Sequence, residues 1–140
     1  MHSVHKKQKG FTLIEVMVVV VILGILAAIV VPNVIGKDDQ ARITATQTTL
    51  QRVDGALKMY KLDNHKFPTT EEGLTALQKK PASAKVFPDG GYLQGAIEDG
   101  WGNPIQYVAP GSGGRAYDLY SFGADGVEGG EGNNADIYLK

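Results

Sequence analysis

Residues 11–31 of the chain read FTLIEVMVVVVILGILAAIVV, and no polar side chain occurs between Val16 and Val31. As an α-helix this segment is roughly 31 Å long, which matches the ~30 Å hydrocarbon core of a bilayer. The single small core of a 140-residue chain does not need so long an apolar run. The sequence therefore predicts a membrane-spanning helix at residues 11–31.

A basic leader, MHSVHKKQKG (residues 1–10), precedes this segment and contains three lysines and no acidic residue. Because basic flanks stay on the cytoplasmic side of a membrane, we expect a cytoplasmic N-terminus and the remaining chain on the opposite side. A cleaved secretory signal peptide is the alternative interpretation. Against it, the apolar run exceeds the ~7–15 residues usual in such peptides, and Glu15 interrupts its beginning.

The junction between leader and helix is the first candidate site. Gly10 is a small residue at the membrane face, where a protease could cut and leave a new amine on Phe11. Glu15 lies one turn inside the apolar segment, where a carboxylate costs about 2.5–3.5 kcal/mol at mid-bilayer and less near the interface. The Phe11 amine, on this chain or a neighbouring one, is the nearest cation. Alternatively, Glu15 reaches the lipid headgroups and has no specific partner.

A second helical pattern follows the apolar segment. Apolar or small residues recur at spacings of three and four from Ile43 to Tyr60, with polar residues on the other face. This stripe predicts that the helix continues through residues 32–62 and covers the core of a small domain, with a coiled-coil seam as the alternative. Pro32 and Gly36 weaken the helix, so we expect a kinked or meltable stretch at residues 32–37.

Residues 63–140 are expected to form a globular domain. The segment PTTEEGLTALQKKP (68–81) predicts a short helix, with Thr69 and Glu72 at capping-box spacing. Strands are expected at Ile105–Ala109, Tyr117–Phe122 and Ile137–Leu139. The predicted fold class is α+β: one long N-terminal helix, transmembrane and then amphipathic, packed on a small antiparallel β-sheet.

The composition argues against several functions. Fourteen Lys and Arg residues balance fifteen Asp and Glu, which argues against nucleic acid bound by bulk charge. The absence of Cys excludes disulfides, thiolate metal sites and a cysteine nucleophile. A hydrolase would have to combine Ser112 or Ser121 with His65, the one histidine beyond the leader, so we expect no enzyme.

The second candidate site is the loop GADGVEGGEGNNAD, residues 123–136, which is rich in glycine and in acidic and amide side chains. Ordering a glycine-rich segment costs entropy, and clustered acids repel one another. A Ca²⁺ ion, which takes roughly 6–8 oxygen ligands, would offset both costs. The spacing is not that of an EF-hand, and a solvated acidic loop without metal is the alternative.

The segment MHSVHKKQKGFTLIEVMVVVVILGILAAIVVP (1–32) resembles the class III prepilin leader and N-terminal helix of type IV pilins and type II secretion pseudopilins. The resemblance implies that prepilin peptidase cuts after Gly10 and N-methylates Phe11. It also implies that Glu15 is needed for methylation and for docking subunits into a helical filament. A softened stretch at Pro32 would then let each helix stretch while its neighbours pack.

Three further segments (59–77, 91–107 and 117–137) resemble the major pseudopilins of the type II secretion system, a type IV pilin-like family. This resemblance implies one bound calcium in the loop of residues 122–136. Its implied ligands are the side chains of Asp125 and Asp136 and the backbone carbonyls of Phe122 and Val127, with Asn134 as a further candidate.

The chain departs from the pattern of that family at three places. Residues 94–96 lack the usual basic side chains, Gly100 replaces a usual Pro, and the chain ends in ADIYLK. The first departure removes the basic partner that the loop of a neighbouring subunit would offer to Asp54. From the last one we expect a C-terminal loop that is less well anchored.

The resemblance implies a structural subunit that rests in the inner membrane and then forms a periplasmic filament for the export of folded proteins. Its implied partners are other copies of itself, prepilin peptidase, minor pseudopilins, the inner-membrane assembly platform and membrane lipid, with no nucleic acid. A type IV pilin or minor pilin for adhesion, motility or DNA uptake is the first alternative. A membrane-anchored periplasmic enzyme or binding module is the second.

Overall fold

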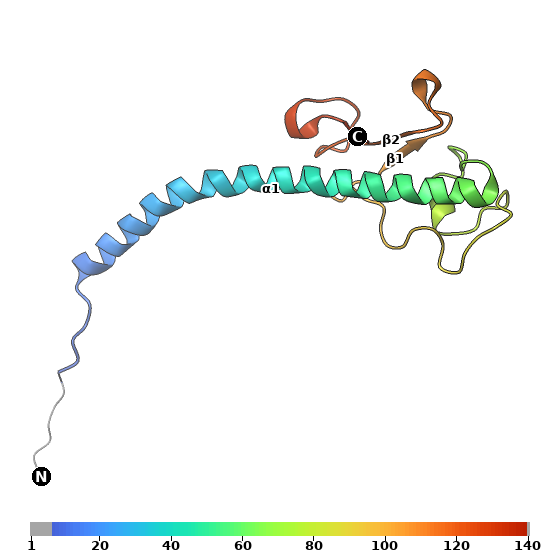
Figure 1. Cartoon of the computed structure of the whole chain (residues 1–140). Helices are drawn as coiled ribbons and strands as arrows, with labels where there is room; N and C mark the ends of the chain where they lie inside the picture. Colours follow the sequence, from blue (N-terminus) through green and yellow to red (C-terminus); the bar gives the residue numbers. More distant parts are fainter. Residues whose placement is uncertain (1–6, 140) are drawn as a thin grey trace, which may run out of the picture. The chain divides into compact units, whose positions relative to one another are not determined.

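The computed structural model describes residues 7–139 of the chain, and for residues 30–36 it describes the backbone only. The first six residues of the predicted leader therefore lie outside the described residues. The chain divides into two compact units, the first ending at Asp38 and the second beginning at Asp39. Its elements, drawn in Figure 1, are α1 (Leu13–Asn64), η1 (Leu74–Leu77), β1 (Gln106–Val108), η2 (Ser112–Gly114), β2 (Asp118–Ser121), η3 (Gly132–Asn134) and β3 (Ile137–Tyr138).

The first unit contains the N-terminal part of α1, which is rich in apolar side chains. Every side chain from Lys7 to Ile29 is exposed. Among the side chains that the structure describes, no helix carries an apolar stretch long enough to cross a membrane.

Helix α1 continues without interruption from Leu13 to Asn64, through both Pro32 and Gly36. The side chains of these two residues lie outside the described ones. A continuous helix does not test whether residues 32–37 melt during assembly, so the softened stretch at Pro32 stays a prediction.

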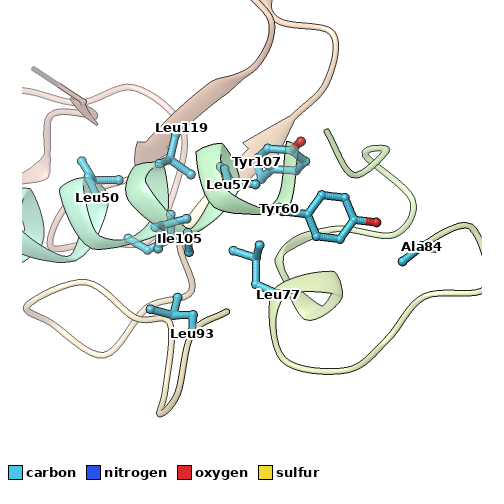
Figure 2. Packing of buried hydrophobic residues seen from close by; sticks show 11 residues of the cluster. Leu50, Leu57, Tyr60, Leu77, Ala84, Leu93, Ile105, Tyr107 and Leu119 are labelled. Atoms are coloured by element: carbon cyan, nitrogen blue, oxygen red, sulfur yellow. The ribbon is translucent and has the colours of Figure 1, made fainter. Parts of the chain in front are cut away.

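The core of the second unit lies along one face of α1. The predicted stripe is confirmed there, because Leu50, Val53, Leu57 and Tyr60 are 0 % exposed. Figure 2 shows Leu50, Leu57 and Tyr60 among residues of the later segments, and Val53 belongs to the same cluster. The stripe therefore covers the core of its own domain. The residues that meet it are Leu77, Ala84, Leu93, Ile105, Tyr107 and Leu119.

Helix α1 ends two residues later than the sequence predicts, at Asn64. His65 adopts a left-handed backbone conformation (φ 62°), and its N–H donates to the Lys61 carbonyl at 2.7 Å. The Asn64 side chain is buried, and its Oδ1 accepts the N–H groups of Lys85 and Val86 at 2.8 and 2.9 Å. Asn64 thus ties the loop after η1 to the end of the helix.

The three predicted strands are present, each shorter than expected, and form one antiparallel sheet in the order β1-β2-β3. The register pairs Tyr107 with Leu119 and Tyr120 with Tyr138. Strand β2 is the central strand, with Leu119 and Ser121 buried on one face. The α+β fold of a long helix and a small antiparallel sheet is therefore confirmed.

The prediction of one short helix within residues 68–81 is wrong about the type of structure. The reciprocal capping bonds do form, with Glu72 N–H donating to Thr69 Oγ1 and Thr69 N–H donating to Glu72 Oε2, both at 3.2 Å. However, Gly73 has a φ of 61°, which no right-handed helix contains. The segment is therefore a capped turn followed by the short 3₁₀ helix η1.

Candidate functional site

The first candidate site lies at the beginning of α1. Residues 7–12 form no regular secondary structure, and Gly10 and Phe11 are exposed, with 88 % of Phe11 accessible. The peptide bond between Gly10 and Phe11 therefore precedes the first helical residue, Leu13. An exposed, non-helical bond of this kind is accessible to a protease.

Glu15 has a partner in its own chain that the sequence reasoning missed. The Thr12 N–H donates to Glu15 Oε2, and the Glu15 N–H donates to Thr12 Oγ1, both at 3.3 Å. This reciprocal pair is a capping box, which satisfies two backbone donors at the helix start. The spacing Thr-x-x-Glu was the signal that could have revealed it.

The capping box explains how Glu15 is held before any cleavage. In the intact chain Phe11 contributes an amide N–H and no amine, so the predicted cationic partner does not yet exist. Hydrolysis after Gly10, if it occurs as the sequence predicts, would create that amine four residues before Glu15. The carboxylate then sits in the first turn of a helix, where the helix dipole also favours negative charge.

The second candidate site, the loop of residues 122–136, is closed at its base. The Ala124 N–H donates to the Asn133 carbonyl at 2.9 Å. Gly123 has a φ of 80°, and a Cβ there would lie 2.6 Å from the Ala135 carbonyl oxygen. Only glycine allows the two ends of the loop to approach so closely.

The two predicted carboxylate ligands accept backbone hydrogen bonds within the loop. Asp125 Oδ1 accepts the Val127 N–H, and Asp136 Oδ1 accepts the Gly129 N–H, each at 3.1 Å. The second bond crosses the loop and draws Asp136 toward its middle. No hydrogen bond or ion pair between described residues links Asp125 to Asp136, and Asn134 uses its N–H to close η3 on the Glu131 carbonyl.

The structure describes no group of three or more His, Cys, Asp or Glu side chains arranged to hold a metal ion. The donor chemistry of the loop nevertheless suits a hard cation, since the implied ligands are all oxygens. The Val127 carbonyl accepts no hydrogen bond from the described residues and so keeps its lone pairs available. The calcium site stays a prediction.

A buried carboxylate connects this loop to the preceding turn, and the sequence reasoning missed it. Asp99 is 7 % exposed; its Oδ1 accepts the N–H groups of Trp101 and Asn103, both at 2.9 Å. Its Oδ2 accepts the hydroxyl of Ser121 at 2.6 Å, and Ser121 Oγ accepts the Gly123 N–H at 3.0 Å. Asp99 therefore organises the turn of residues 99–103 and, through Ser121, holds the start of the loop.

The loop and strand β3 both contact α1 near the beginning of the second unit. Asn133 Nδ2 donates to Asp39 Oδ2 at 2.8 Å, and Gln47 Nε2 donates to the Tyr138 carbonyl at 3.2 Å. Neither contact is visible in the sequence pattern, because each joins residues more than 90 positions apart.

Asp54 finds both of its partners within the same chain. Lys58 Nζ lies 2.7 Å from Asp54 Oδ2, and the Tyr117 hydroxyl donates to Asp54 Oδ1. Burial and this bond to Asp54 raise the pKa of Tyr117. These contacts accord with the missing basic residues at 94–96, where the Gln94 carbonyl instead accepts a bond from Arg52 of the same chain at 3.3 Å.

The residues that a hydrolase would need are not brought together. Ser121 donates to Asp99, and Ser112 Oγ accepts from Arg115 at 2.7 Å. His65 ends α1, and no hydrogen bond between described residues connects its imidazole to either serine. The described part of the chain thus contains no Ser–His pair.

Two family descriptions match the chain and together cover nearly all of it. Residues 5–31 match the prokaryotic N-terminal methylation motif, which contains Gly10, Phe11 and Glu15. Residues 33–140 match the family described as type II secretion system, protein G.

Similar proteins and a solved structure point to the same family. The type II secretion system core protein G of Pseudomonas aeruginosa is 55 % identical over 135 residues, covering 94 % of each chain. The core protein G of Vibrio cholerae is 51 % identical, covering 94 % of this chain and 91 % of its own. The crystal structure of the major pseudopilin from the type 2 secretion system of enterohaemorrhagic Escherichia coli superposes with a TM-score of 0.65 at 35 % identity, over 76 % of this chain and 93 % of that one. The chain therefore belongs to the protein G family of the type II secretion system, the family of its major pseudopilins, which are structural proteins and not enzymes.

Proposed function

We propose that this chain is the repeating subunit of a periplasmic pseudopilus and polymerises through its N-terminal helix. The observation that carries the proposal is the apolar surface of residues 11–29, where every side chain is exposed in the isolated chain. An exposed apolar surface of this extent needs a covering partner. Lipid of the inner membrane is the partner before assembly, and the same helix in neighbouring subunits replaces it in the filament.

The membrane-bound precursor has its N-terminus in the cytoplasm and its second unit in the periplasm. The lysines of the leader support this orientation, because basic residues remain on the cytoplasmic side. Prepilin peptidase then cuts after Gly10 and methylates the Phe11 amine. The exposed, non-helical backbone of residues 7–12 supports access to that bond.

Glu15 directs docking of a processed subunit. A carboxylate in an apolar environment is costly unless it is paired, and the Phe11 amine of an adjacent subunit supplies the opposite charge. The capping box with Thr12 holds Glu15 at the start of the helix and so keeps it near the new N-terminus. This pairing selects the axial position at which a new subunit stops.

Assembly draws each subunit out of the membrane and onto the growing filament. The inner-membrane assembly platform and the minor pseudopilins are the implied partners, and ATP is spent by another protein. Softening of α1 at Pro32 lets the helix stretch while neighbouring helices pack. The filament then acts as a piston or screw that moves folded proteins toward an outer-membrane channel.

Calcium stabilises the loop of residues 122–136 in this proposal. Asp125 and Asp136 supply carboxylate oxygens, Phe122 and Val127 supply carbonyl oxygens, and Asn134 is a further ligand. The oxygen-only donor set and the closed base of the loop support the assignment. The ion takes the place of a disulfide in a domain that has no cysteine.

Complementation of a strain that lacks its own copy of this subunit tests the proposed function. The wild-type chain should restore both exoprotein secretion and filaments recovered from the periplasm. Glu15→Ala should be inserted and cleaved normally yet form no filament, whereas an enzyme or binding module on a membrane anchor would tolerate the change. Surface fibres with secretion unaffected by deletion would instead identify a type IV pilin.

A further inference from the structure

The end of α1 carries an exposed groove that the proposed N-terminal contacts do not use. A groove of about 690 Å³ is lined by Lys58, Lys61, Leu62, His65 and Phe67, here called the helix-end patch. Leu62 is 77 % exposed, although it is a large apolar side chain. The Nζ of Lys61 lies 4.8 Å from the centre of the Phe67 ring. The patch therefore combines the apolar side chains of Leu62 and Phe67 with a cation.

Of the two lysines that line this patch, Lys58 is already paired with an acidic residue, and Lys61 is the cation that a partner could meet. Asp54 pairs with Lys58 and Tyr117, and Asp63 accepts the hydroxyl of Tyr92 at 2.8 Å. Within the described residues, Lys61 has no acidic partner. A binding segment that suits the patch therefore needs one apolar side chain next to a carboxylate.

The loop of residues 122–136 presents that combination. Val127 is 60 % exposed, and Glu128 and Glu131 are exposed beside it. Residues 123–136 contain four acidic residues and no Lys or Arg. Glu128 and Glu131 are also outside the proposed calcium ligand set, and neither forms an ion pair in the described part of the chain.

The loop and the patch lie at opposite ends of the second unit. The loop contacts Asp39 near the start of this unit, whereas the patch begins at Lys58 (Figure 1). Lys61 follows Asp39 by 22 residues in the same helix, which is about 33 Å along its axis. One chain therefore cannot bring its own loop to its own patch.

We infer that the loop of one subunit docks on the helix-end patch of a second copy, with Val127 against Leu62 and Phe67 and Glu128 beside Lys61. Because the two surfaces differ, the contact is heterologous and repeats from subunit to subunit. Heterologous contacts that do not close into a ring generate open helical filaments. The inference rests on the proposed function and adds to it a contact between the periplasmic units.

Disulfide cross-linking tests this contact directly, because the native chain contains no cysteine. The full-length chain with Leu62→Cys and Val127→Cys together is expressed in the complementation strain, and its filaments are oxidised. Each subunit should link to one neighbour on either side, so a ladder of covalent multimers is expected. Each single variant, and the control pair Leu62→Cys with Glu98→Cys, should give no ladder.

Charge exchange supplies a second, independent readout. Lys61→Glu alone and Glu128→Lys alone should each weaken assembly, by up to about fivefold per contact for an exposed ion pair. The double variant should recover the filament yield, while Lys79→Glu, an exposed lysine outside the patch, should leave it unchanged. Recovery in the double variant supports the pairing even if the cysteine pair hinders assembly.

Two results would overturn the inference. One is normal filaments with neither a ladder nor any effect of charge reversal, which leaves the proposed function intact. The other is a cross-link from Leu62→Cys to a different protein, which would make that protein the occupant of the patch. Absence of any wild-type filament would count against the proposed function itself.

Discussion

Gly100 lies directly against the backbone of Arg42 in α1. A Cβ at Gly100 would be 2.3 Å from the Arg42 carbonyl oxygen, closer than real Cβ atoms approach. The Gly100 N–H donates to Thr46 Oγ1 at 2.9 Å, and its carbonyl accepts Arg42 Nη1 at 2.8 Å. The position that departs from the family pattern is thus the attachment point of the turn of residues 99–103 on the helix.

Replacement of Gly100 by Ala should therefore destabilise the second unit. Forcing a methyl group into this contact costs about 1–3 kcal/mol, since backbone must shift on one side. Thermal or urea unfolding of residues 39–140 measures the change. Gly55→Ala is the matched control, because no heavy atom lies within 4 Å of its Cβ position. There the substitution should stabilise the helix by about 0.5–1 kcal/mol.

The observed helix capping by Glu15 and its proposed charge pairing can be separated by Glu15→Gln. Glutamine also accepts the capping bond from Thr12 but has no charge to pair with an amine. We expect normal insertion and cleavage, with filament formation reduced to the level of Glu15→Ala. Immunoblots for processing and electron microscopy of sheared filaments measure both. Filaments at wild-type yield would show that the charge is dispensable.

Thr12→Val is the complementary change, because it removes the hydroxyl that accepts the Glu15 N–H. Loss of this cap should cost the helix about 0.5–2 kcal/mol while leaving the carboxylate in place. Assembly should therefore persist. A Thr12→Val chain as inactive as Glu15→Gln would show that assembly needs the cap as well as the charge.

Calcium should stabilise the second unit against heat. At a calcium concentration a hundredfold above the dissociation constant, mass action gives about 2.7 kcal/mol, which is several degrees in Tm for a domain of this size. The measurement is thermal unfolding of residues 39–140, first in chelator and then in millimolar calcium. The shift should disappear in Asp125→Ala and persist in Glu131→Gln. Equal Tm values in both buffers would favour the alternative, in which the loop is solvated and holds no metal.

Asp99→Asn should destabilise the second unit and loosen the loop without changing the size of the side chain. Asp99 accepts three hydrogen bonds, and an amide NH₂ replaces one accepting oxygen with a donor. One buried donor is then left without its acceptor, at a cost of about 1–3 kcal/mol. Hydrogen exchange should show faster exchange at Gly123 and Ala124 than in the wild type. Hydrogen exchange of the Asn133→Ala variant, which removes only the side-chain contact with Asp39, is measured for comparison with Asp99→Asn.

Stability should fall at alkaline pH through the titration of Tyr92. Burial, and then the hydrogen bond that its hydroxyl donates to Asp63, raise the pKa of Tyr92 to about 12. The native state holds this proton more tightly than the unfolded state does. The protonated Tyr92 hydroxyl therefore makes its full contribution to the free energy of unfolding below pH 10. This contribution is lost between pH 10 and about 12. Across this pH range the urea midpoint of Tyr92→Phe should decline less steeply than that of the wild type. An identical decline in both would contradict the assignment of this stability loss to Tyr92.

Local patterns in the sequence were sufficient for the main elements. The apolar stripe from Ile43 to Tyr60 correctly placed the buried face of α1, and β-branched and aromatic runs located all three strands. The family was also readable from Gly10, Phe11 and Glu15 with the later segments. These features depend on periodicity and residue type over short stretches, where each residue's neighbours along the chain determine its environment.

Contacts between distant segments could not be read in the same way. The positive φ of Gly73 turned an expected helix into a turn and a 3₁₀ helix, although the capping bonds of Thr69 and Glu72 formed as predicted. The sequence alone therefore determined the long helix, its buried face, the strands and the family. Packing determined the attachment of Gly100 to Arg42, the burial of Asp99 and the separation of the loop from the helix-end patch, because each depends on segments that meet only in the folded chain.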